Sequence, residues 1–212
     1  MGYYLLHLHL HGLFRGHDLE LGRDADTGGQ TTYVLELAKG LAARPEVDRV
    51  DVVTRLIQDK RVSPDYAQAH EPLADGASIV RFPCGPRRYL RKELLWPYLD
   101  EMADAVTAHI AAQPQRPNWI HAHYADAGYV GALVSQRLGI PLVFTGHSLG
   151  REKQRRLLEG GLTHEQIFEV TDTTAYFNYT NRMTHGLGML PNVEYFGMNR
   201  LPDPGLQKDA AD

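Results

Sequence analysis

Short apolar runs alternate with amphipathic stretches along most of this 212-residue chain. The apolar runs predict strands over residues 3–10, 47–57, 77–84, 118–124 and 140–148. Apolar positions at helical spacing predict helices over residues 30–43, 94–112 and 127–139. Repeated alternation of strands and helices is typical of a parallel sheet covered on both faces, so we expect an α/β, Rossmann-like domain.

The loops that follow the predicted strands carry most of the polar residues. Ligands of parallel sheets bind beyond the carboxyl ends of the strands. The loops at that edge span residues 11–30, 84–93, 121–128 and 145–153, which are rich in His, Arg, Lys and Asp. The candidate binding residues are therefore expected along one edge of the sheet.

The stretch "GRDADTGGQTTYVLELAKGL" runs from a loop into a helix. Gly28 and Gly29 have no Cβ, so backbone N–H groups there can approach a ligand closely. The first turn of a helix leaves N–H donors unpaired and carries the positive end of the dipole, which makes a candidate phosphate site. On the local pattern alone, a simple helix start capped by Thr27 or Gly28 stays an open alternative.

The carboxylates of the same loop have a structural interpretation. Asp24 and Asp26 would suit acid–base chemistry, but a role in bracing the loop together with Arg23 fits their position better. We therefore expect neither to act on a substrate.

Composition excludes several classes of protein. Hydrophobic residues make up 43% and charged residues 23%, which is typical of a soluble globular domain. A net charge of −4 argues against a nucleic-acid partner. No apolar run is long enough for a membrane span, and "MGYYLLHLHLHGLF" lacks the basic region of a signal peptide. The single cysteine, Cys84, has no disulfide partner, so we expect a structural thiol and a cytoplasmic location.

Alternating histidines mark the first predicted strand. His7, His9 and His11 share one strand face, but no carboxylate stands beside them, so no metal site is expected. His11 is instead placed at the start of the loop that leads to Gly28 and Gly29, near a ligand bound there. We expect His121 and His123 to lie at the edge of the core and not to act as ligands.

Five ordered blocks carry a resemblance to a known family. They are "LHGLFRGHDLELGRDADTGGQTTYVLELAKGL", "DVVTR", "KELLWPYLDEMADA", "HAHYADAGYVG" and "PLVFTGHSLGREKQRRLL". On these, residues 3 to about 161 resemble the N-terminal part of sucrose-phosphate synthases and, more broadly, of sucrose synthases and other retaining GT-B glycosyltransferases. The resemblance implies a partial acceptor domain of a two-domain fold. It also implies glucosyl transfer from UDP-glucose to fructose 6-phosphate with anomeric retention, with UDP-glucose as co-substrate and no resident cofactor.

The expected donor side lies around the helix start. Gly28 and Gly29 would present backbone donors to the diphosphate, whose charge grows as UDP leaves. Gln30 can hydrogen-bond sugar hydroxyls or the acceptor. By the resemblance, His147 and Ser148 of "GHSLG" lie close to the reacting sugars, and His147 acts there by positioning and polarity.

The expected acceptor side takes its charge from basic residues. Lys153, with Arg151 beside it, follows the last predicted strand and is a good partner for a phosphate. Lys92 and Tyr124 are expected to line the same acceptor pocket.

The resemblance ends near residue 161. We expect an incomplete glycosyltransferase-like domain over residues 1–162, a helical extension of different origin over 163–190 and a flexible tail over 191–212. The segment "FEVTDTTAYFNYTNRMTHGLG" is similar, over a short length, to the closing helix of carboxymuconolactone decarboxylase-like and alkylhydroperoxidase-like proteins. The paired redox cysteines of those proteins are absent from the sequence, so no peroxidase role is expected.

Two classes of function stay open. The first is an enzyme or enzyme subunit of sucrose-phosphate synthesis whose donor domain comes from another chain. A truncated or rearranged gene product would show this pattern, and we do not expect catalysis by the chain alone. The second is a non-catalytic remnant that binds a sugar phosphate. An NAD-binding domain is disfavoured, because the loop after the first strand lacks the compact G-x-G-x-x-G turn.

Overall fold

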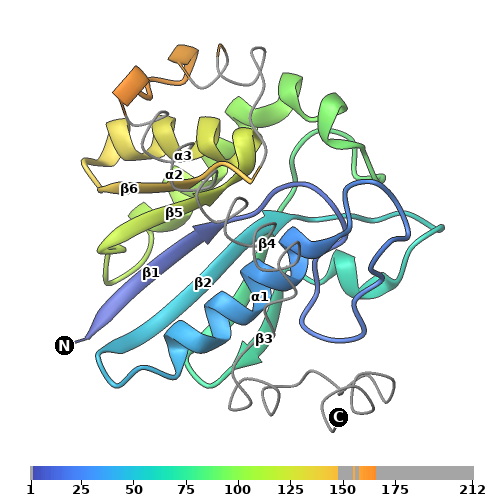
Figure 1. Cartoon of the computed structure of the whole chain (residues 1–212), viewed down its shortest axis with the longest axis horizontal. Coiled ribbons are helices and arrows are strands. Elements are labelled where there is room, and N and C mark those ends of the chain that lie inside the picture. Colours follow the sequence, from blue (N-terminus) through green and yellow to red (C-terminus); the bar gives the residue numbers. More distant parts are fainter. Residues whose placement is uncertain (1, 148–154, 156–157, 166–212) are drawn as a thin grey trace, which may run out of the picture. The chain divides into compact units, whose positions relative to one another are not determined.

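A six-stranded sheet organises the computed structural model, which describes residues 2–147, 155 and 158–165 (Figure 1). The strands are β1 (Tyr3–Leu8), β2 (Val47–Arg55), β3 (His70–Ala74), β4 (Ala77–Phe82), β5 (Trp119–His123) and β6 (Leu142–Thr145). Their order is β3-β4-β2-β1-β5-β6, and all neighbouring pairs are parallel except β3 and β4. The predicted Rossmann-like α/β fold is confirmed.

The antiparallel edge strand β3 is missing from the predicted set of strands. It contains Pro72, which cannot donate to a ladder and is tolerated at a sheet edge. Asp75 and Gly76 connect it to β4, and Gly76 takes a left-handed φ of 73°. An Asp-Gly pair before an apolar run indicates a β-hairpin, so the sequence does contain the information needed to predict β3.

Within residues 2–147, three α-helices flank the sheet: α1 (Gly29–Ala42), α2 (Leu99–Ala111) and α3 (Tyr124–Leu138). The predicted helix over 94–112 is too long, because α2 begins only at Leu99 and two 3₁₀ turns, Lys92–Leu94 and Trp96–Tyr98, precede it. Pro97 disfavours the α-helical conformation at Trp96, the residue before it. α3 starts three residues earlier than predicted and ends at Leu138, followed by Gly139 as the C-cap residue with a left-handed φ of 66°. None of the described helices is long and apolar enough to cross a membrane.

The central strand β1 sends alternate side chains to two separate core clusters. Leu6 and Leu8 are buried with residues of α2 and α3, whereas Leu5 is buried with residues of α1. Because neighbouring side chains of a strand point to opposite faces, α1 covers one face of the sheet and α2 and α3 cover the other. Figure 1 shows α1 passing in front of the strands.

Cys84 belongs to the core. Its side chain is buried, and its Sγ donates to the carbonyl oxygen of Tyr98 at 3.1 Å. Burial raises the pKa of the Cys84 thiol to about 12, so the group is inert near neutral pH, as expected of a structural thiol.

The predicted C-terminal segments are mostly beyond the described residues. Of the extension over 163–190, only residues 163–165 are described, and none of the tail over 191–212 is. The predicted boundaries of these segments therefore stay predictions.

Close packing of α3 on the sheet leads to a stability prediction. A Cβ on Gly131 would lie 2.9 Å from Cδ1 of Leu142 and 3.1 Å from Cβ of Ala122, whereas a Cβ on Gly40 of α1 would meet nothing within 4 Å. We expect Gly131→Val to lower the free energy of unfolding by about 1–3 kcal/mol through overpacking. The matched Gly40→Val should change it by less than about 0.5 kcal/mol in urea denaturation. Equal effects would contradict the packing argument.

Candidate active site

The amino-terminal end of α1 is open. Gly28 is the N-cap residue in extended conformation, and no side chain caps the helix. Thr27 has another role, because its Oγ1 accepts a hydrogen bond from the Leu13 N–H at 3.0 Å. A Cβ added to Gly28 or Gly29 would meet no atom within 4 Å. The first turn therefore has the unobstructed surroundings that an anion site requires.

The loop before α1 is held by carboxylates. Oδ1 of Asp24 accepts hydrogen bonds from the backbone N–H groups of Asp26 and Thr27, both at 2.8 Å. Asp24 thus braces the loop as predicted. Arg23 braces the same loop through other partners, because it pairs with Glu20 and donates to the carbonyl oxygen of Arg61.

Lys92 ties this loop to the segment after β4. Its backbone N–H donates to Oδ2 of Asp26 at 2.9 Å, and its ammonium group pairs with Oδ1 of the same carboxylate. Burial opposes the charge of Asp26, yet these bonds from Lys92 keep the pKa of Asp26 below its usual value. An acceptor phosphate at Lys92 would therefore compete with Asp26.

A second buried ion pair joins the loop to α3. Nδ1 of His11 lies 2.8 Å from Oδ2 of Asp126, and both side chains are almost completely buried. Burial disfavours the charged imidazole, but the Asp126 carboxylate outweighs burial and raises the pKa of His11. Asp126 is absent from the predicted site, although a carboxylate in the first turn of a helix at this edge is a usable signal.

Tyr124 packs against this pair. Its ring lies edge-on to the His11 ring, with the centroids 4.6 Å apart. Tyr124 has a left-handed φ of 77°, a conformation that costs about 1–3 kcal/mol in a residue other than glycine. Such strain is frequent at ligand-binding sites, which agrees with the predicted role of Tyr124.

His147 and Gln30 approach the carboxyl ends of β1 and β5. Nε2 of His147 lies 3.4 Å from Nδ1 of His123, and the ring of Tyr33 on α1 stands edge-on at 5.3 Å. Nε2 of Gln30 lies 3.0 Å from Nδ1 of His9. Burial, and then the charge on His11, lower the pKa of His147 to about 4. His147 is therefore neutral near pH 7 and offers polarity without charge.

A model of the glycosyl transferase 4-like domain matches residues 28–167, which is more than half of the chain. The chain belongs to this family. The matched range includes α1 and every candidate site residue named from Gly28 to Lys153.

Relatives and a solved structure agree with this assignment. The glycosyltransferase domain is 45% identical over 190 residues to probable sucrose-phosphate synthase 1 of Oryza sativa subsp. indica and to sucrose-phosphate synthase of Zea mays. The alignment covers 77% of this chain and 18% of each relative, so the chain spans less than a fifth of their length. The structure of sucrose-phosphate synthase from Thermosynechococcus elongatus matches with a TM-score of 0.57 and 25% identity, over 81% of this chain and 40% of that one.

The glycosyltransferase domain gathers most predicted site residues at the carboxyl edge of the sheet. These are Gly28, Gly29, Gln30, Lys92, Tyr124 and His147. Ser148, Arg151 and Lys153 lie outside the described residues, and their roles stay predictions.

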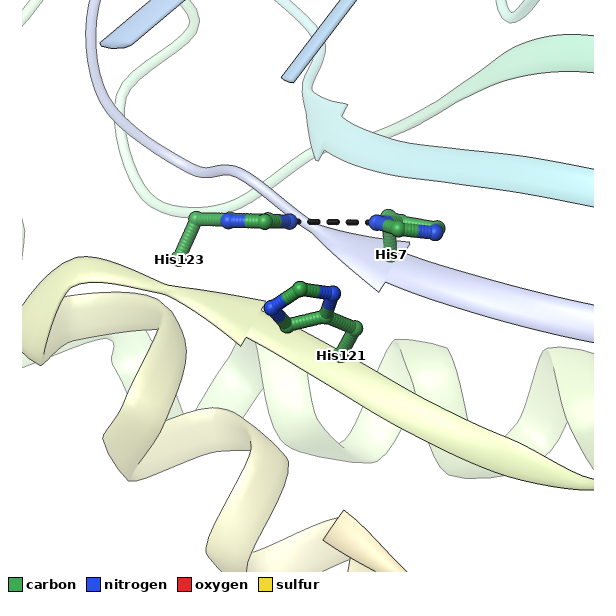
Figure 2. A group of neighbouring side chains, drawn as sticks. All are labelled: His7, His121 and His123. Atoms are coloured by element: carbon green, nitrogen blue, oxygen red, sulfur yellow. Dashed lines mark hydrogen bonds between the residues drawn. The ribbon is translucent and has the colours of Figure 1, made fainter. Parts of the chain in front are cut away.

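Three histidines of β1 and β5, His7, His121 and His123, form a group near His147. Figure 2 shows the ring edges of His7 and His123 facing one another, with His121 next to them. His7 and His123 are fully buried and His121 is partly buried. Burial, and then the neighbouring His121, lower the pKa of His7 to about 3. Burial, and then His147, lower the pKa of His121 to about 4, so both imidazoles are neutral near pH 7.

The His11–Asp126 pair leads to a pH-dependent prediction. Because the pKa of His11 is raised on folding, its charged form stabilises the fold below about pH 6.5, and this contribution is lost as pH rises through the raised pKa. We expect Asp126→Asn to lower the free energy of unfolding by about 1–3 kcal/mol at pH 6 and by less at pH 9. Urea denaturation at both pH values measures this.

The control for that experiment is Asp104→Asn, which removes an exposed ion pair with Arg137. It should change stability little at either pH. A loss in Asp126→Asn that is the same at pH 6 and pH 9 would contradict a charged His11.

Proposed function

We propose that the chain supplies the acceptor-side wall of a retaining glycosyltransferase site that transfers glucose from UDP-glucose to fructose 6-phosphate. The open amino-terminal end of α1, formed by Gly28 and Gly29, is the observation that carries the proposal. The family match and relatives named sucrose-phosphate synthase support the choice of substrates. A donor domain from outside residues 1–162 would complete the site, and we place the reaction in the cytoplasm.

The donor diphosphate would bind at the first turn of α1. Backbone N–H groups near Gly28 and Gly29 would then stabilise the charge that develops as UDP leaves, which is the kind of interaction that contributes most to catalysis. Gln30 stands at the same turn and can hydrogen-bond a sugar hydroxyl while His9 fixes its amide. His147, neutral near pH 7, would orient the sugars by hydrogen bonding without acting as a nucleophile.

The acceptor phosphate would bind among basic residues on the neighbouring loops. Lys153 and Arg151 are proposed as its main partners, with Ser148 beside the reacting sugars. Lys92 and Tyr124 would line the same pocket. Charge-assisted hydrogen bonds of this kind are about twice as strong as neutral ones, so they would distinguish the sugar phosphate from the free sugar.

A second candidate function is binding of a sugar phosphate without catalysis. The two proposals differ in the donor: a catalytic half-site binds both ligands, whereas a binding module needs only the sugar phosphate.

Calorimetry with UDP-glucose tests the donor side. Because a side chain at residue 29 would meet no protein atom, Gly29→Val should leave the thermal midpoint unchanged while weakening UDP-glucose binding at least tenfold. Gly40→Val, in the same helix, is the matched control and should bind normally. If the unsubstituted chain binds fructose 6-phosphate but not UDP-glucose, the non-catalytic function is favoured instead.

Calorimetry with fructose 6-phosphate and with free fructose tests the acceptor side. Lys153→Ala should weaken fructose 6-phosphate binding at least tenfold and reduce its dependence on salt, because one phosphate contact is lost. Lys39→Ala removes a lysine that pairs with Glu36 on the surface of α1 and should have no effect. Unchanged binding in Lys153→Ala would remove this residue from the site.

A further inference from the structure

The parallel pairing of β1 with β5 brings three histidines onto one face of the sheet. His7 is the register partner of His121, and His123 follows two residues later on the same face of β5. The three residues offer ligand nitrogens that all lie within 4.8 Å of one another. From their pairing across these two strands, we propose that His7, His121 and His123 form a binding site for a divalent transition-metal ion, with zinc as the best match.

The spacing of the nitrogens suits such an ion. A zinc–nitrogen distance of about 2.0–2.1 Å in tetrahedral geometry places ligand nitrogens roughly 3.3 Å apart. Nδ1 of His7 and Nε2 of His123 lie 3.1 Å apart. Figure 2 shows that these two nitrogens face one another directly and that the ring of His121 lies against them. Rotation of the imidazole rings that turns the three nitrogens, now within 4.8 Å of one another, toward one point would bring all three to coordination distance.

In His121 and His123, the ring nitrogen that would not coordinate the ion has a neighbouring polar atom, as is usual for metal-binding histidines. Nε2 of His121 lies 2.8 Å from Oγ1 of Thr145, which leaves Nδ1 of His121 free to coordinate. Nδ1 of His123 lies 3.4 Å from Nε2 of His147. Partners of this kind fix the orientation and tautomer of a ligating imidazole. His7 differs, because its Nε2 is buried without a hydrogen-bond partner among the described residues.

Burial and access are also compatible with a metal ion. His7 and His123 are fully buried, whereas His121 is partly exposed and provides a route for the ion. Three neutral imidazoles leave one tetrahedral position open, as in zinc sites that keep a water molecule. The absence of a carboxylate from one strand, which argues against a site on β1 alone, is therefore no obstacle once β5 contributes two ligands.

Calorimetry with zinc chloride on the metal-free 212-residue chain tests the proposal. We expect binding of one ion per chain, weakened at least tenfold in His7→Leu and in His121→Asn. His121→Asn is included because the side chain of His121 is only partly buried, so this substitution disturbs the core less than one at His7 or His123. Circular dichroism establishes that each variant is folded.

His17→Leu is the control, because His17 is exposed and lies 3.4–3.6 Å from carboxylate oxygens of Glu71 and Asp65, which makes it the best alternative metal ligand. Its zinc affinity should be unchanged. Cobalt added in place of zinc should give the visible absorption of a tetrahedral complex in the unsubstituted chain and in His17→Leu only. Absence of zinc binding, or equal binding by His121→Asn, would overturn the proposal.

Discussion

Burial of β1 on both faces is the constraint on which the rest of the structure depends. It lies between β2 and β5, so its alternate side chains enter two cores and none of them from Tyr4 onward reaches solvent freely. Leu6 and Leu8 meet α2 and α3, whereas His7 follows Leu5 towards the face covered by α1. A polar group in such a position must find its partners inside the protein. For Nδ1 of His7 this partner is His123 on β5, whereas Nε2 of His7 has none among the described residues.

Two charged groups of the described part of the site, His11 and Lys92, are already paired before any ligand arrives. His11 is matched by Asp126 and Lys92 by Asp26, while His7, His121 and His147 are neutral near pH 7. Uncompensated positive potential is therefore provided by oriented backbone groups at the start of α1. At the start of α1, this arrangement favours a ligand that brings its own negative charge to the backbone N–H groups.

Local patterns in the sequence predict most of the fold. Apolar runs mark strands, helical spacing marks helices and Gly139 marks a helix end, and each of these patterns can be recognised within a short stretch of sequence. The start of α2 is less predictable, since Pro97 replaces the first expected turn by 3₁₀ turns. Residues of the site can be predicted only where the local sequence indicates a binding loop, as the glycines before α1 do at Gly28. The pairing of His11 with Asp126 depends on contacts between residues more than a hundred positions apart, and strand register decides them.

The two bonds between Lys92 and Asp26 have separate consequences. The backbone N–H of Lys92 holds one oxygen of Asp26, and the ammonium group holds the other. A phosphate that attracted the ammonium group would leave the backbone bond in place, and the nearby charged His11 would still balance the carboxylate. The loop can thus exchange its counter-ion for a ligand while it keeps its anchor, so that binding at this lysine does not require the loop to unfold.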